Sequence, residues 1–299
     1  MNNRASDVTA FEVCQLNALL TQLLVAVSQQ FLHMLRLRRL GHPDMFARLK
    51  VVDDLDFPNA MQIVDFLMKM GAPVTVGPHL IAPARFTRDI LQTELAFEQG
   101  FQAFLQTLEF QSGGAQERLA QAKAPREAYR SWLAETLGHT PPDPDAQCPV
   151  PEKPRLFPVL LHLMEQSLLH AFANWHEDMV EEASTSWQIS GAAMLYLTAL
   201  SDFCGSENHE AGGIKIPETA VVDTIVRFDA DIRLVQESAE AARELAETSE
   251  DRKLAKLCLK VAEDCDRVVG TRNGAPIEAI LGRSSVFGDF SDTRARFAH

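Results

Sequence analysis

The sequence lacks the short motifs that mark common catalytic sites. It contains no GxSxG, no P-loop, no GxGxxG and no HExxH, so the signatures of serine hydrolases, nucleotide-binding proteins and zinc proteases are missing. Its five cysteines form no CxxC pair and are odd in number, which argues against a zinc ribbon and against a disulfide framework. The sequence therefore predicts a protein of a reducing compartment, and we expect it in the cytoplasm.

Positive charge and long apolar runs are also scarce. The chain has 28 Lys and Arg against 41 Asp and Glu, a formal net charge of −13, and only Arg36–Arg39 gathers basic residues. Because such a chain repels a phosphate backbone, we expect no nucleic-acid partner. No apolar run approaches the roughly 20 residues of a membrane span, and Met1–Asp7 leads into an amphipathic helix, so we expect no membrane association.

Helical periodicity is what the sequence has in abundance. Hydrophobic residues make up 46% of its 299 residues, enough for a large core, and they recur at helical spacing. Pro58 is interpreted as a kink or division within a helix, Pro125 as a break, and Gly113–Gly114 as a helix end. The predicted helices cover about residues 6–40, 44–70, 87–111 and 115–138, then 160–180, 187–203, 218–247 and 249–270. This pattern predicts an all-α fold.

The two halves of the chain follow the same plan. Pro78 precedes Glu98 by 20 residues, Pro217 precedes Glu237 by 20, and a short extended piece (74–76 or 214–216) comes just before each proline. An offset of about 140 residues predicts an internal repeat of two four-helix bundles in tandem, with long crossover connections. The predicted domains are residues 1–139 and 159–270, with a proline-rich linker at 140–158 and an irregular tail at 271–299.

The first half resembles a known family. Leu16–Leu20 with Leu24–His33, and then Met70–Pro73, look like the first helix and the end of the second helix of bacterioferritins, and Glu94–Glu98 looks like part of their third helix. The resemblance covers about residues 10–110, and the second half matches only in pattern. It implies a duplicated, degenerate member of the ferritin-like superfamily. It also implies a di-iron site made by a glutamate on each of two helices and a Glu-x-x-His pair on each of the other two, since carboxylates suit iron.

Carried over to this chain, the family's ligand set is incomplete. The first-helix glutamate falls on Leu23, and the second-helix Glu-x-x-His falls on Asp56 and Asn59, of which only Asp56 is a good ligand. The methionine that binds haem in the family is replaced by Phe57, so the resemblance implies no haem in this chain. Glu98 matches the third-helix glutamate.

The fourth-helix pair falls near Glu135, one residue out of step with the family pattern. In the second half, acidic residues occur at the corresponding helix positions. The predicted metal ligands of both halves are Asp56, Glu98, Glu165, Glu237, Glu263 and Asp266. The opposing interpretation of Asp56 is a residue that marks a helix start, and that of the others is a polar residue on a helix face. His33, His162, His170 and His176 are interpreted as core or boundary histidines.

Two functions stay open. The first is a non-haem di-iron oxidoreductase that uses oxygen to oxidise a small molecule or iron itself. The second is a ferritin-like scaffold or interaction subunit that has lost its metals. The loss at Leu23 and Asn59 favours the second for the first half, while the carboxylates retained in the second half leave the first open. The expected partner is accordingly a small-molecule substrate or another protein, which includes further copies of this chain in a homo-oligomer.

Overall fold

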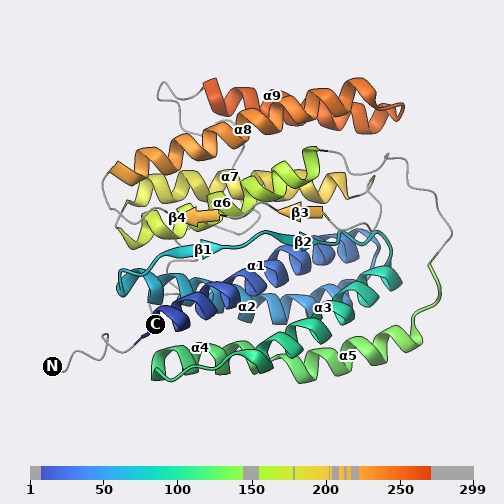
Figure 1. Ribbon diagram of the computed structural model, residues 1–299. Helices are drawn as coiled ribbons and strands as arrows, with labels where there is room; N and C mark the ends of the chain where they lie inside the picture. Colours follow the sequence, from blue (N-terminus) through green and yellow to red (C-terminus); the bar gives the residue numbers. More distant parts are fainter. Residues whose placement is uncertain are drawn as a thin grey trace. The chain divides into compact units, whose positions relative to one another are not determined.

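The computed structural model describes residues 8–143, 155–177, 179–201, 203, 209–211, 214–216 and 222–270. These residues are mostly helical, which confirms the predicted all-α fold (Figure 1). The chain divides into two compact units, Met1–Ala146 with Gly213–Glu218, and Gln147–Gly212 with Thr219–His299. The predicted tail at 271–299 and most of the predicted linker at 140–158 lie outside the described residues.

Two long helices form the core of the first unit. α1 (Ala10–Arg39) begins at a capping box, in which the Thr9 hydroxyl accepts the N–H of Glu12 and the Glu12 carboxylate accepts that of Thr9. α2 (Pro43–Lys69) continues through Pro58, so this proline does not divide the helix. The two helices pack against each other along their apolar faces.

Three shorter helices belong to the same unit: α3 (Thr87–Thr107), α4 (Gly113–Lys123) and α5 (Arg126–His139). α3 packs against α1 and α5, and α4 packs against α2. The break between α4 and α5 was predicted, but the prediction that Gly113 ends a helix is wrong, because Gly113 begins α4. The physical reason is distant in sequence: the Glu12 carboxylate accepts the N–H groups of Gln111 and Ser112, both at 2.8 Å, just before α4 starts.

The connector between α2 and α3 is largely extended. It contains β1 (Val74–Val76), on the predicted extended piece, and β2 (His79–Ile81). β1 pairs antiparallel with β4 (Ile214–Ile216), and Thr75 lies opposite Lys215. A segment from the second half of the chain therefore completes one edge of the first unit, which the sequence did not predict.

A polar stripe on α1 holds the same connector. Its side chains are spaced by three, four or eight residues, which places them on one face of the helix. They hydrogen-bond to backbone atoms between residues 73 and 85 of the connector. The α1 residues that make these bonds are Asn17, Thr21, Gln29, His33 and Arg36. The sequence indicated His33 as a core or boundary histidine but gave no sign of the stripe as a whole.

The second unit is also built from helices. They are α6 (Leu156–His176), α7 (Val180–Leu200), α8 (Val222–Thr248) and α9 (Arg252–Gly270), with β3 (His209–Ala211) between α7 and α8. α6 packs against α7 and α8, and α8 packs against α9. The last helix, predicted from residue 249, begins at Arg252, where the Asp251 carboxylate accepts the N–H groups of Lys253 and Leu254.

Two of the described helices, α1 and α6, have the length and apolarity of a membrane span, although no such stretch was expected from the sequence. Their most apolar 18-residue stretches have mean hydropathies of 1.5 and 1.2. Within these stretches, 61% and 78% of the residues are buried inside the protein. A buried core helix has the same properties without entering a membrane, so the cytoplasmic location stays a prediction.

Candidate functional site

A cluster of buried polar side chains lies in the core of the first unit. It draws residues from α1, α2, α3 and α5, and each member is at most 5% exposed. We call these residues the polar core cluster: Gln30, His33, Asp56, Glu94, Glu98, Arg126 and Tyr129. Burial of so many ionisable groups is unfavourable by several kcal/mol unless the groups are paired. Their partners therefore decide what the site can do.

Arg126 is the permanent cation of the cluster. Its Nη1 donates to Glu98 Oε1 at 2.5 Å, its Nη2 donates to Asp56 Oδ1, and its Nε donates to the Ala122 carbonyl at 3.1 Å. The guanidinium carbon also lies 4.4 Å from the centre of the Phe101 ring, as in a cation–π contact. One positive charge thus bridges two carboxylates from different helices, and each guanidinium nitrogen has an acceptor.

His33 and Tyr129 hold the third carboxylate. The Nδ1 atom of His33 lies 2.5 Å from Glu94 Oε1, and the Tyr129 hydroxyl donates to Glu94 Oε2 at 3.1 Å. Burial and the charge of Glu94 raise the pKa of Tyr129 well above its usual value, so the phenol stays a neutral donor. The Nε2 atom of His33 lies 2.9 Å from the Ala82 carbonyl oxygen and 3.1 Å from the Ala84 amide nitrogen. Both ring nitrogens are therefore engaged within the protein.

Burial also shifts the protonation of the acidic residues. It raises the pKa of Glu98 to about 7, even though Arg126 acts in the opposite direction. Burial likewise raises the pKa of Asp56, and burial with the charge of Asp56 raises the pKa of the neighbouring Asp53 to about 8. Burial alone would lower the pKa of Arg126, but Asp56 and Glu98 raise it. The site thus combines a fixed cation with a carboxyl group, that of Glu98, which takes up a proton near neutral pH.

The predicted metal ligands of the first half meet this arginine. Asp56 and Glu98 do converge, and the group between them is the Arg126 guanidinium. The prediction places the fourth-helix pair near Glu135, which is exposed. The α5 residues that reach the carboxylates are Arg126 and Tyr129, three residues apart and hence on one helix face. Neither residue belongs to the carboxylate and histidine set of the di-iron pattern, so that pattern did not indicate them.

The four predicted ligands of the second half are not brought together. Glu165 is buried on α6. Glu237 has 42% of its side chain exposed and Asp266 has 57%, and each forms an ion pair with a surface arginine. Glu263 is exposed on α9. Glu98 and Glu237, which the predicted repeat places at corresponding positions, lie in different environments: Glu98 is buried, and Glu237 is partly exposed.

The second unit nevertheless repeats one part of the polar core cluster. The Nδ1 atom of His170 on α6 lies 2.8 Å from Asp231 Oδ1 on α8. These two residues are 61 positions apart in the chain, and so are His33 and Glu94. The repeat that relates the two pairs has an offset of 137 residues, from 33 to 170 and from 94 to 231. This common spacing was the signal in the sequence that could have found both pairs.

Asp231 has two further hydrogen-bond partners. Its Oδ1 also accepts from Gln166 Nε2 at 3.1 Å, and its Oδ2 accepts from the Ser186 hydroxyl at 3.1 Å. Gln166 precedes His170 by four residues, as Gln29 precedes its histidine in the first unit. The carboxylate of Asp231 is therefore already surrounded by donors.

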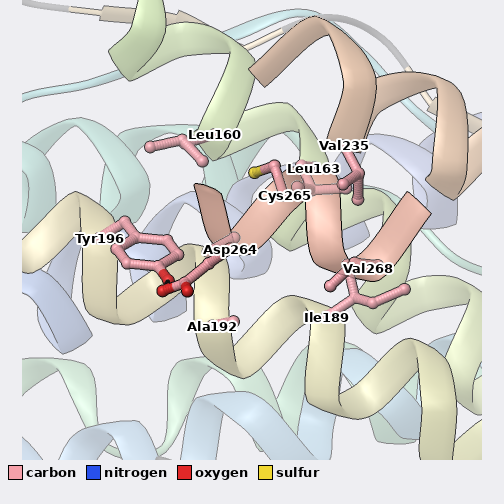
Figure 2. Close-up of a pocket in the computed structure, with 10 residues that line it drawn as sticks. Leu160, Leu163, Ile189, Ala192, Tyr196, Val235, Asp264, Cys265 and Val268 are labelled. Carbon is pink, nitrogen blue, oxygen red and sulfur yellow. Dashed lines mark hydrogen bonds between the residues drawn. The ribbon is translucent and has the colours of Figure 1, made fainter. Parts of the chain in front are cut away.

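A small pocket lies between α6, α7, α8 and α9 of the second unit (Figure 2). Its volume of about 20 Å³ is room for roughly one water molecule. Tyr196 donates to Asp264 at its edge, and Cys265 forms part of its wall. Burial raises the pKa of Cys265 to about 12, so the thiol stays protonated and is a poor nucleophile. This pocket is too small for an organic substrate.

The polar core cluster does not fit a di-iron centre. Such a centre needs carboxylates free to coordinate, imidazole with an available nitrogen, and open positions for oxygen. Here Asp56 and Glu98 are bound by Arg126, and Glu94 is bound by His33 and Tyr129. Among all described residues, no group of three or more His, Cys, Asp or Glu side chains is placed to hold a metal ion. The expected di-iron centre and its oxidoreductase chemistry therefore have no support in the described geometry.

Comparisons with known proteins add no identification. The chain matches no protein-family model, no curated protein sequence and no solved structure. The resemblance to bacterioferritins therefore stays a prediction.

Proposed function

We propose that this protein is a metal-free, duplicated ferritin-like protein that acts as a scaffold or interaction subunit. Its role would be to bind other molecules, and redox chemistry at iron would have no part in it. The observation that carries this proposal is the bridge from Arg126 to Asp56 and Glu98 in the core of the first unit.

The bridging arginine supplies the positive charge that two buried carboxylates need. Without a cation between them, Asp56 and Glu98 would repel each other in surroundings of low polarity. A guanidinium provides this charge at every physiological pH, but it has no coordination sites and no redox chemistry. Arg126 therefore ties a carboxylate of α2 to one of α3, which supports a role in holding α2, α3 and α5 together.

Two features support the ferritin-like and duplicated parts of the proposal. In each half a connector with short strands lies between the second and third long helices, with β1 and β2 in the first and β3 and β4 in the second. Each half also carries a buried histidine–carboxylate pair at a separation of 61 residues. The carboxylates retained in the second half left the di-iron oxidoreductase open for that half, but three of the four lie at the surface.

Metal analysis of the purified protein tests the proposal. The full chain, prepared without chelator, is analysed by mass spectrometry, and again after anaerobic loading with ferrous iron and exposure to oxygen. We expect far less than one iron per chain in both preparations and no new near-ultraviolet absorption. About two irons per chain with such an absorption on oxygenation would overturn the proposal, because a di-iron site requires that stoichiometry.

A further inference from the structure

An open groove of about 840 Å³ runs along the first part of α1. One wall is formed by residues between Val8 and Gln22, and the other by residues between Met70 and Gly77. Phe104 of α3 adds an aromatic ring to the lining. The volume falls within the range of about 300–1,000 Å³ that is usual for sites of small organic molecules.

The groove carries no charge on any of the described residues that line it. Charged residues make up 23% of the chain, so about three of the fifteen lining residues would be charged if they were drawn at random. The lining is instead mainly apolar, as at Val13, Ala18, Met70 and Phe104. This uncharged lining differs from the rest of the protein, which has a net charge of −13. A charged ligand would lose its hydration here without gaining an opposite charge, so the groove favours a neutral one.

Hydrogen bonds fix the two walls to each other. Asn17 Nδ2 donates to the Pro73 carbonyl at 3.0 Å, and Asn17 Oδ1 accepts the Thr75 N–H at 2.7 Å. Thr21 Oγ1 accepts the Gly77 N–H at 3.0 Å. The groove is thus formed before any ligand arrives, which lowers the entropic cost of binding.

Two polar side chains in the lining remain available to a ligand. Within the described structure, the side chains of Gln22 and Thr75 make no hydrogen bond, and both line the groove from opposite walls. A few such groups in an apolar site orient a ligand and provide specificity.

We propose that this groove binds an uncharged, largely apolar small molecule whose own polar groups reach Gln22 and Thr75. This inference rests on the proposed function, since it names the class of ligand that a binding protein of this kind takes. It needs no metal and does not involve the polar core cluster.

The first test is a titration of the full chain with N-phenyl-1-naphthylamine, a neutral probe whose fluorescence rises in apolar surroundings. We expect saturable binding to wild type and a loss of affinity of about tenfold or more in Cys14→Glu, which places a charge in the groove at an exposed residue. Ala96→Glu adds the same charge at an exposed position of α3 outside the groove and should bind as wild type does. Equal binding by both variants would overturn the proposal.

A second measurement avoids substitutions. The rate at which iodoacetamide alkylates Cys14 in wild type is followed by peptide mass spectrometry, and saturating probe should slow it several-fold because the thiol lines the groove. An unchanged rate would contradict the proposal.

A concentration-dependent dimer in sedimentation, lost in Cys14→Glu, would assign the groove to a second copy and also overturn the proposal. The iron content of the same preparation is measured separately. If iron-free protein does not bind the probe, the groove proposal alone is rejected. If the protein contains bound iron, the proposed function alone is rejected.

Discussion

Arg126 and Asp56 are 70 residues apart in the chain and form an ion pair in which neither side chain is more than 3% exposed. Glu98 binds the other end of the same guanidinium at 2.5 Å. Because the three residues come from three helices, the pairing joins α2, α3 and α5 through one charged group. Single substitutions at these positions can therefore separate the structural role of the cluster from any metal chemistry.

Replacement of Arg126 by alanine should destabilise the protein strongly. It leaves Asp56 and Glu98 buried without a cation, and loss of one partner from a buried ion pair typically costs about 3–5 kcal/mol. The matched control is Arg130→Ala on the same helix, where the ion pair with Glu127 reaches solvent, with side chains 28% and 74% exposed, and should contribute less than about 1 kcal/mol. Urea unfolding at pH 7 measures both. Similar small losses in the two variants would mean that the buried pair is energetically unimportant.

Removal of the same arginine should also create affinity for a divalent cation. In Arg126→Ala, Asp56 and Glu98 keep their positions while the competing charge is gone, so added cobalt should raise the melting temperature by binding only the folded state. Wild type should show no such rise. The double variant Arg126→Ala/Glu98→Gln, which loses one of the two carboxylates, should lose most of it. A rise of equal size in wild type would contradict the view that the guanidinium occupies the cation position.

The protonation of Glu98 should make stability fall as pH rises. Its pKa is about 7 in the folded protein, against an ordinary value of 4.5. The folded state therefore retains a proton that the unfolded chain releases. This contribution, on the order of 3 kcal/mol, is fully present below pH 4.5 and is lost as pH rises through 7. Glu98→Gln cannot titrate, so its unfolding free energy should fall less than that of wild type between pH 5 and 7.5. Parallel curves for the two proteins would refute this assignment.

Glu12 should behave in the opposite way. Burial would raise its pKa, but hydrogen bonds from the backbone N–H groups of Ser112, Thr9 and Gln111 lower it to about 2. A lowered pKa stabilises the fold above pH 4.5, and the effect disappears as pH falls towards 2. We expect Glu12→Gln to lose about 1–2 kcal/mol at pH 7 and progressively less below pH 4.5. The exposed Glu109→Gln is the control, and an equal loss there would contradict the role of Glu12.

His33 should control the mobility of the connector that it binds. In His33→Ala, Glu94 loses one buried partner and the Ala84 amide loses its acceptor, at a cost of about 1–3 kcal/mol. Hydrogen exchange measured by mass spectrometry should become faster in peptides that contain Ala82 and Ala84. His42→Ala is the control, because His42 precedes α2 and its side chain makes no capping hydrogen bond. If exchange in the connector is equally slow in both variants, His33 does not hold it.

Much of the fold was accessible from the sequence because local interactions set it. The helical periodicity, the stop after α2 at Gly71, where φ is +66°, and the break before α5 at Pro125 all depend on neighbouring residues. The extended piece at 74–76 was also predicted correctly. Such features need no knowledge of what the chain packs against.

The tertiary structure alone decided the character of the buried site. Asp56 and Glu98 were recognisable as carboxylates at ligand-like positions, but nothing near them in sequence indicates that Arg126 lies between them. Glu237 was predicted to match Glu98, and only packing shows that one faces solvent and the other a cation. In the same way, the Ser112 N–H donates to the carboxylate of Glu12, which lies 100 residues earlier in the chain. Burial and long-range pairing determine which charges meet, and those depend on how separate helices pack, which a local pattern does not encode.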